Sequence, residues 1–419
     1  MLAYKKGTNI ILLGDVMQCK TCYYKYKNIY NIVGFSNIDI QCRSTIYGHT
    51  VYPIDELQVL FGAKVVILSN NWYKVCSALS NMGLRFFYDY IPYSFFEYID
   101  INLRDLYNLC NKEHLEAVLN SLMGEKEGCV IHGNCQTMAI IKYLNANKTF
   151  TSKYIILKTP LAFAYDDYKM LDCKELFNKT SLLLEMYIKD TNRYSPKVST
   201  EQFEQLMPKE CKKIIIPNFW FEGYFPQHTK NEYNVLTDVD KTGLFFWGDK
   251  NVNELVKNHT RADDIIDILV EEDFYSKEEL ESHFAKCLQN VFESEQEADI
   301  KMYDYIAGNY QNQILFYSVN HPVNSVIKEL VIRIILYLGL EDSVEKVFFN
   351  KVEILDSRPL LKGVTETVYP AVIKYLGIEN GETWTYSPTV LSLKNQFFTE
   401  EPNFEECIRE MLNNCFGIV

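Results

Sequence analysis

Short apolar runs alternate with helical patterns along the first hundred residues. Apolar runs at residues 9–13, 31–35 and 64–69 are typical of buried strands, whereas residues 17–30 and 72–82 have the spacing of helices. An extended segment, a short helix and a last strand complete this part, at 48–52, 55–60 and 85–88. Because strands that alternate with helices usually form parallel sheets with right-handed crossovers, the pattern predicts a small Rossmann-like domain.

The same alternation continues beyond residue 103. Residues 103–122 form a predicted helix with one polar face, and a charged connector follows between Gly124 and Gly128. Further strands are predicted at 129–131, 154–157, 181–187, 213–216 and 314–316, and helices at 137–144, 200–206, 261–268, 271–290, 325–338, 369–376 and 407–411. We therefore expect an α/β chain with a Rossmann-like domain at 1–103, a helical connector at 104–127 and a larger, doubly wound domain at 128–419.

Composition and charge exclude several classes of function. The chain has 419 residues, of which 47% are apolar, and its net charge is −13. So acidic a chain is not expected to bind nucleic acid, which needs a basic face. The longest apolar runs, such as 331–338, are far shorter than the ~20 residues of a membrane span, and the N-terminus does not have the pattern of a signal peptide. We therefore expect a cytoplasmic protein without a membrane span.

The cysteines indicate reduced thiols rather than a disulfide framework or a metal site. There are twelve of them without regular spacing, as is usual for a cytosolic protein. Cys19 and Cys22 have the CxxC spacing, but zinc would need a second ligand pair, which the sequence lacks. We therefore predict that both pack in the first turns of a helix and that no metal is bound.

The first domain departs from the dinucleotide-binding pattern. The turn after its first strand keeps only one glycine, Gly14, so the close backbone approach to a pyrophosphate is lost or altered. The acid expected after the second strand is replaced by Ser36 and Asn37. A docking or regulatory role is therefore favoured over NAD binding.

The segment HGNCQ, residues 132–136, carries the strongest chemical signal. It lies between a predicted strand and a predicted helix, where the free N–H groups of the helix favour a thiolate at Cys135 and can hold a developing oxyanion. Gly133 permits a sharp turn and a close approach of substrate, and the amides of Asn134 and Gln136 could add donors. Cys135 therefore lies where hydrolases place the serine of a nucleophile elbow. The alternative is a buried cysteine before a helix that Asn134 caps.

Two later segments place polar groups just beyond predicted strands. Asn218 follows the strand at 213–216, where open α/β sheets bind ligands, so it could hold the same oxyanion or orient a sugar. His321 lies between Asn320 and Pro322, and an imidazole there can accept a thiol or sugar proton near neutral pH. The alternative for His321 is a structural role as a cap or a buried ring, and His228 is a weaker base candidate.

Aromatic side chains are concentrated around Asn218. Aromatic faces suit sugar rings and an adenine, although packing is the commoner role for each ring taken singly. The group comprises Phe219, Trp220, Phe221, Tyr224 and Phe225.

Three blocks together resemble the WcbI-type family of capsular polysaccharide biosynthesis. They are HGNCQ, IPNFWFEGYFPQ at 216–227 and FYSVNHPVN at 316–324. The resemblance implies an α/β fold like that of the SGNH hydrolases and acyl transfer from a coenzyme A (CoA) thioester to a sugar hydroxyl. In SGNH-type hydrolases an aspartate lies three residues before the histidine, but this chain has Ser318 there. We therefore expect Asn320 or a distant carboxylate to orient His321.

The leading hypothesis is acetyl transfer from acetyl-CoA to a sugar or polysaccharide acceptor. Cys135 either forms an acyl-enzyme or stays unloaded while His321 deprotonates the sugar hydroxyl. A thiol-dependent esterase or deacetylase of polysaccharide and a non-catalytic subunit that binds sugar or CoA are the alternatives. The expected residues are Cys135 and His321 for catalysis, Gly133, Asn134, Gln136, Asn218 and Asn320 for the oxyanion or substrate, and His132, Tyr224 and Arg261 for CoA.

Overall fold

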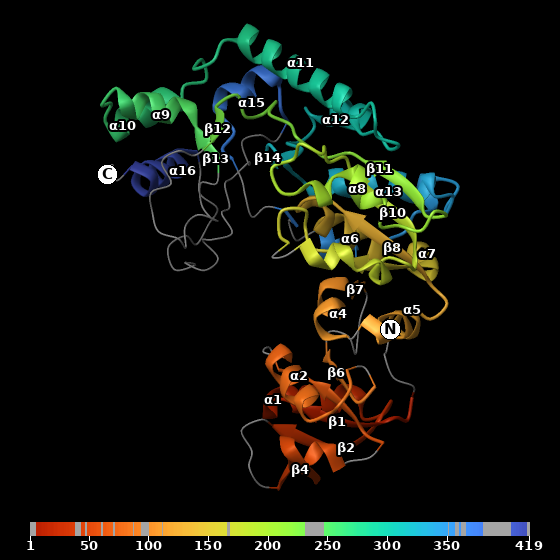
Figure 1. Ribbon diagram of the computed structural model, residues 1–419. Coiled ribbons are helices and arrows are strands. Elements are labelled where there is room, and N and C mark those ends of the chain that lie inside the picture. Colours follow the sequence, from red (N-terminus) through yellow and green to blue (C-terminus); the bar gives the residue numbers. More distant parts are fainter. Residues whose placement is uncertain are drawn as a thin grey trace.

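Two large sheets and two two-stranded sheets, with helices around them, form the part of the protein that the structure describes (Figure 1). One large sheet has six strands and the other has five, so the predicted α/β fold is confirmed. The computed structural model describes residues 6–37, 43–46, 48–59, 62–69, 72–86, 88–93, 100–110, 112–165, 168–230, 247–350, 352–356, 360–361, 366–379 and 404–416.

The first sheet is built by the N-terminal residues, drawn mainly in red in Figure 1. Its strand order is β3-β4-β2-β1-β5-β6, and all neighbours are parallel except β3 and β4. The strands are β1 (Asn9–Leu13), β2 (Asn31–Asn37), β3 (Ser44–Ile46), β4 (His49–Pro53), β5 (Lys64–Ile67) and β6 (Tyr90–Pro92). The helices are α1 (Val16–Tyr26), the 3-10 helix η1 (Ile54–Val59) and α2 (Trp72–Asn81).

The last strand of this sheet lies later than predicted. The backbone N–H and the guanidinium of Arg85 both donate to the Asp89 carboxylate, at 2.9 and 3.0 Å. This pairing folds the described residues of 85–89 into a turn, and the strand follows at β6. The prediction of a strand at 85–88 was therefore wrong, because apolar content alone did not reveal the local ion pair.

The second sheet is wholly parallel, with the order β11-β10-β8-β9-β7. Its strands are β7 (Asp100–Asn102), β8 (Glu127–His132), β9 (Tyr154–Lys158), β10 (Thr180–Met186) and β11 (Lys212–Ile216). Strand β7 was not predicted, and its residues fall within the range assigned to the first domain. The division of the chain into domains stays a prediction.

The central strand β8 separates two apolar cores. Cys129 and Ile131 belong to one core, together with α6 (Gln136–Ala146) and α13 (Asn324–Tyr337), which pack against each other. Val130 belongs to the other core, which is continuous with that of the first sheet and includes α4 (Leu103–Leu109), α5 (Lys112–Met123) and α8 (Thr200–Glu204). A strand that is apolar on both faces is what a doubly wound sheet requires.

The remaining elements complete the larger part of the molecule. In Figure 1, α9, α10 and α16 gather far from β8. No helix among the described residues is both long and apolar enough to cross a bilayer. The elements are α7 (Lys148–Lys153), η2 (Tyr168–Asp172), η3 (Lys174–Leu176), η4 (Pro196–Val198), β12 (His228–Lys230), β13 (Trp247–Asp249), α9 (Lys250–Lys257), α10 (Ala262–Leu269), α11 (Lys277–Ser294), α12 (Tyr303–Asn309), β14 (Phe316–Ser318), β15 (His321–Pro322), η6 (Val344–Lys346), α14 (Val352–Asp356), α15 (Pro370–Leu376), α16 (Phe404–Met411) and the π-helix η9 (Leu412–Phe416).

Candidate active site

The turn between β8 and α6 holds a cysteine at the carboxyl edge of the second sheet. Cys135 occupies the position before the first residue of α6 and already has helical backbone angles. The side-chain oxygen of Asn134 accepts the backbone N–H of Gln136 at 2.9 Å, which satisfies one of the free donors at the helix start. The Cys135 side chain is only half-buried, so it differs from the core cysteine of the alternative interpretation.

His321 faces this cysteine from the hairpin of β14 and β15. The Sγ atom of Cys135 and the Nε2 atom of His321 are 3.4 Å apart, although 186 residues separate them in the chain. This is a hydrogen-bonding distance for sulfur, and it lets the imidazole take the thiol proton without rearrangement. The structure therefore brings together the two residues that the sequence named as catalytic.

Ser318 orients the imidazole. Its Oγ lies 2.8 Å from Nδ1 of His321 and donates to Oδ1 of Asn320 at 3.4 Å. With the ring proton on Nδ1 donating to Ser318, the lone pair of Nε2 is directed toward the thiol. The sequence prediction named Asn320 or a distant carboxylate for this role. In the structure Ser318 contacts the ring, and Asn320 contacts Ser318 rather than the ring. The sequence contains a signal for this role, because Ser318 lies three residues before the histidine, where SGNH-type hydrolases have an aspartate. The prediction took into account that serine has no charge but not that its hydroxyl can accept a hydrogen bond.

Burial keeps both members of the pair neutral. It lowers the pKa of His321 to about 4, and no carboxylate touches the ring to oppose this among the described contacts. Burial also raises the pKa of the Cys135 thiol, and the backbone N–H groups of Cys135 and Gln136 offset the rise only in part. The thiolate expected from the helix dipole is therefore not the resting form, which is a thiol beside a neutral imidazole.

Gln136 joins the three sequence blocks and is fully buried. Its Nε2 donates to the backbone oxygens of Phe219 and Asn320, both at 2.9 Å. Its Oε1 accepts the backbone N–H of Phe219 at 3.1 Å. Both amide protons of Gln136 already bind protein oxygens. The side chain is therefore not free to bind a substrate oxyanion, although the sequence had suggested that role. Gln136 is a positioning residue.

Asn134 and Asn218 form a second link between blocks at the edge of the site. Nδ2 of Asn134 donates to Oδ1 of Asn218 at 2.8 Å. Asn218 is exposed, and this bond uses its oxygen and not its Nδ2 donors. The orientation leaves the amide of Asn218 suited to the predicted role at an oxyanion or sugar. That role stays a prediction.

Gly133 serves packing more directly than substrate approach. A Cβ atom at this position would lie 2.7 Å from Sδ of Met186 and 3.0 Å from Cγ2 of Thr137. The space is thus filled by β10 and α6 and not left open to a ligand. The backbone oxygen of Gly133 accepts the N–H of Ala162 at 2.9 Å, which fixes the turn further.

His132 lies in the core and not in a CoA site. Its ring stacks on Phe203, with 3.7 Å between ring centroids, and Nε2 lies 2.9 Å from the backbone oxygen of Val198. The residue has no exposed surface, and burial lowers its pKa to about 4. This buried position does not support the predicted contact of His132 with CoA, which stays a prediction.

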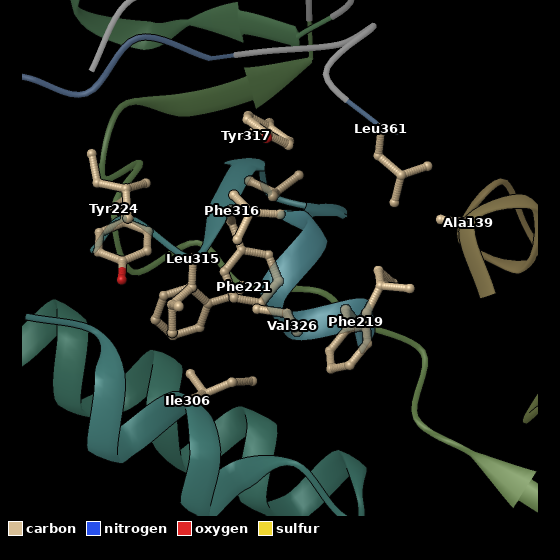
Figure 2. Close-up of a cluster of buried hydrophobic side chains, with 14 of the residues drawn as sticks. Ala139, Phe219, Phe221, Tyr224, Ile306, Leu315, Phe316, Tyr317, Val326 and Leu361 are labelled. Carbon is tan, nitrogen blue, oxygen red and sulfur yellow. The ribbon is translucent and has the colours of Figure 1, made fainter. Parts of the chain in front are cut away.

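Tyr224 is also a core residue. Figure 2 shows it among buried rings, where Phe221 lies 5.4 Å from Tyr224 and 5.0 Å from Phe316 between centroids. The hydroxyl of Tyr224 donates to the backbone oxygen of Tyr310 at 3.0 Å. Its full burial fits the packing alternative, and the contact of Tyr224 with CoA stays a prediction that this position does not support.

Arg261 is exposed but lies far from the turn that holds Cys135. It precedes α10, which packs with α9 and α16 far from β8 and α6 in Figure 1. The guanidinium is therefore remote from Cys135. The predicted contact with a CoA phosphate does not fit this position, and the solvated face that the sequence also allowed does.

His228, the weaker base candidate, is paired elsewhere. Its Nδ1 lies 2.8 Å from the Glu366 carboxylate, whose other oxygen accepts the backbone N–H of Val319. The Trp220 ring packs edge-on against His228 and stays 47% exposed. This pair supports the backbone that leads to His321, but it does not reach Cys135.

A metal centre does not form among the residues that the structure describes. No three His, Cys, Asp or Glu side chains in these ranges converge on one point. The CxxC cysteines, Cys19 and Cys22, are buried in α1.

Comparison with known proteins points to one family. The family model described as polysaccharide biosynthesis enzyme WcbI matches residues 128–343. A search of curated proteins finds no match. A solved structure of WcbI, called a novel polysaccharide biosynthesis enzyme and described as free of a disulfide bond between CoA and a cysteine, is similar at 17% identity with a TM-score of 0.51. The alignment covers 70% of this chain and 99% of that one, and it shows a shared fold. Because the family model spans more than half of the sequence, the chain belongs to the WcbI family of polysaccharide biosynthesis enzymes.

Proposed function

We propose that this protein is an O-acetyltransferase that moves an acetyl group from acetyl-CoA to a sugar hydroxyl during the synthesis of a surface, capsular polysaccharide. The observation that carries the proposal is the 3.4 Å contact between the Cys135 thiol and the His321 imidazole at the carboxyl edge of a parallel sheet. A nucleophile and a base so placed are the minimum for acyl transfer. We place the reaction in the cytoplasm, where acyl-CoA donors are found.

A thioester donor fits the residues present. The sulfur of Cys135 is half-buried, and the related WcbI structure, described as free of a disulfide bond between CoA and a cysteine, names CoA beside a cysteine of that protein. The resting pair is neutral, so the site binds a neutral thioester without displacing a counter-ion. Acetyl-CoA is the substrate in this proposal, CoA leaves as a product, and neither is a resident cofactor.

His321 moves protons in both halves of the proposed reaction. Its Nε2 takes the proton of Cys135 as the sulfur attacks the thioester carbon, and it returns that proton to the departing CoA sulfur. In the second half, Nε2 takes the proton of the sugar hydroxyl as its oxygen bonds to the acyl carbon. The bond between that carbon and the Cys135 sulfur then breaks, and Nε2 returns the proton to the sulfur, which restores the thiol. Ser318 holds the ring in place throughout. In this proposal the backbone N–H of Cys135 and the amide of Asn218 hold the oxyanion, since the Nδ2 of Asn218 is not used in its bond with Asn134.

Incubation with acetyl-CoA labelled in the acetyl group, without a sugar acceptor, tests the proposal. We expect label on the protein at Cys135 and none in Cys135→Ala. Label in neither, together with acetyl transfer that survives Cys135→Ala, would show that His321 acts directly on the sugar. Absence of CoA binding by the wild-type protein would overturn the acyltransferase and favour a thiol esterase, which can be assayed with an acetylated polysaccharide.

A further inference from the structure

Trp220 is an exposed ring between two buried ones. Phe219 and Phe221 are 3% and 1% exposed and pack in the core of Figure 2, whereas Trp220 is 47% exposed. Asn218 is exposed as well, so exposed and buried side chains alternate from 218 to 221, as they do in an extended segment. Trp220 therefore lies on the same face as Asn218, ~7 Å further along the chain.

The backbone on either side of Trp220 is bound to both catalytic blocks. Before it, the side chain of Gln136 binds the backbone N–H and the backbone oxygen of Phe219. After it, the N–H of Phe221 donates to the backbone oxygen of Val319 at 2.6 Å. The first partner directly follows the proposed nucleophile, and the second lies two residues before the proposed base. The indole is thus anchored within a few residues of both.

Neighbouring groups fix the indole in one orientation. Its Nε1 donates to Oε1 of Glu222 at 2.9 Å. The His228 ring lies 5.9 Å and the Trp247 ring 5.7 Å from it between centroids, and both rings are nearly perpendicular to it. Neither ring is stacked parallel to the indole, and nearly half of the side chain stays exposed. We call Trp220, Glu222, His228 and Trp247 the Trp220 platform.

The polar edge of the Trp220 platform offers hydrogen-bond acceptors. Among the described residues, no hydrogen bond uses Oε2 of Glu222 or Nε2 of His228. Nδ1 of His228 lies 2.8 Å from the Glu366 carboxylate, and a proton on Nδ1 leaves the lone pair of Nε2 ready to accept. Glu366 is 8% exposed and also accepts the N–H of Val319, so it ties the platform to the β14–β15 hairpin.

These groups suit a neutral sugar better than the phosphates of CoA. A sugar ring presents apolar C–H groups to an aromatic face and hydroxyl protons to acceptors. Ionised phosphate oxygens have no proton to donate and would be repelled by the carboxylates of Glu222 and Glu366. Lys230, opposite Trp247, is the one lysine of β12 and β13, so the carboxylates outnumber it.

We infer that the Trp220 platform binds the acceptor, a neutral pyranose that stacks on the indole and donates hydroxyl protons to Glu222 and His228. The inference rests on the proposed function and adds the acceptor's position to it. The acceptor extends from the indole past Asn218, which lies on the same face, toward Nε2 of His321. Trp220 is then a binding residue for the acceptor and does not touch the donor.

Saturation-transfer NMR with a mixture of methyl glucopyranoside, galactopyranoside and mannopyranoside tests this position. We expect the wild-type protein to saturate the ring C–H protons of a glycoside, and Trp220→Ala to do so about fivefold less or weaker still. Trp220→Phe, which keeps an aromatic face, should restore most of the signal. Phe292→Ala is the matched control, because Phe292 of α11 is also 47% exposed and lies outside the platform.

Calorimetric titration with CoA and the acetyl-transfer assay separate the two substrates. Trp220→Ala should bind CoA as the wild type does, and it should raise the KM for the sugar but not the KM for acetyl-CoA. Equal saturation transfer in the wild type and Trp220→Ala, or none in the wild type, would overturn the acceptor position while leaving the acyltransferase intact. Weaker CoA binding in Trp220→Ala would overturn it in favour of a donor site. Failure of the wild-type protein to bind CoA would instead overturn the proposed function, whereas the glycoside signal decides the sugar site by itself.

Discussion

The β1–α1 turn and the β8–α6 turn have the same order of parts but different surroundings. Each follows a buried parallel strand, contains a glycine and then an Asp or Asn that caps the next helix, and has a cysteine nearby: Cys19 in the first and Cys135 in the second. Cys19 is 4% exposed and donates to the backbone oxygen of Leu12 at 3.5 Å. Burial raises its pKa to about 12, so this thiol is inert.

The two turns differ most in where their polar side chains bind. In the first, Asp15 and Gln18 satisfy each other's backbone N–H groups in a capping box within α1. In the second, Asn134 binds Asn218 and Gln136 binds Phe219 and Asn320, which lie 83 to 184 residues away. A turn that closes on itself supports a fold, whereas a turn whose side chains bind distant segments assembles a site.

Removing the two sulfurs gives the sharpest contrast between the turns. Cys135→Ala should lower acetyl transfer by about 10³-fold or more, because it removes the proposed nucleophile. Cys19→Ala should leave the rate within about twofold and lower the free energy of unfolding by about 1 kcal/mol, because a small buried group is lost. Measured rates with acetyl-CoA and a sugar acceptor, together with denaturant curves, check both. Equal effects of the two substitutions on the rate would remove the distinction between the turns.

Much of this contrast could be read from the sequence, because the signals are local. The apolar run before Gly133 and the polar HGNCQ turn predicted the strand, the turn and the helix, and the strand-end positions of Cys135 and His321 predicted that they would meet. The same reasoning did not foresee the burial of His132 and Tyr224. Both lie inside motif blocks, yet their side chains point into cores, and the direction of a side chain depends on long-range packing.

The positions of Gln136, Ser318 and Arg261 depend on how distant segments pack. Sequence spacing marked Gln136 as a donor to substrate, and only the folded chain shows that its amide is consumed by Phe219 and Asn320. Arg261 has suitable chemistry, but its helix lies far from the site.

Gln136 of the β8–α6 turn and Gln18 of the β1–α1 turn give the next contrast. Gln136→Ala removes three hydrogen bonds in a buried site and should lower the free energy of unfolding by ~2–4 kcal/mol, with acetyl transfer reduced as the three blocks lose their alignment. Gln18→Ala removes one exposed hydrogen bond of a capping box. It should lower the free energy of unfolding by ~0.5–1 kcal/mol without changing the rate of acetyl transfer. Urea unfolding of both variants measures the difference.

Gln136→Glu is the control for this pair. It keeps the acceptor for the Phe219 N–H and the side-chain volume, but it faces the two backbone oxygens with a carboxylate. We expect it to be at least as destabilising as Gln136→Ala, since the buried carboxylate would have only the Phe219 N–H as a donor and would face two backbone oxygens. A Gln136→Ala protein as stable as Gln18→Ala would contradict the positioning role of Gln136.

The smallest expected effect concerns the protonation of the Cys135–His321 pair. Because burial raises the pKa of Cys135, alkylation of this thiol should be slow at pH 7 and accelerate as the pH rises beyond 9.

Ser318→Asp places a carboxylate beside Nδ1 of His321. This carboxylate should raise the pKa of the imidazole from its value of about 4 and stabilise the thiolate of Cys135 as the partner of an imidazolium. Alkylation at pH 7 should then quicken about tenfold, read at the Cys135 peptide by mass spectrometry. Ser318→Ala, which removes the hydrogen bond without adding charge, should slow acetyl transfer but leave the alkylation profile at high pH. If the pH dependence of Cys135 alkylation is unchanged in Ser318→Asp, the charge of the His321 ring does not affect the pKa of the Cys135 thiol. Each group of the pair would then be neutral because of its own burial.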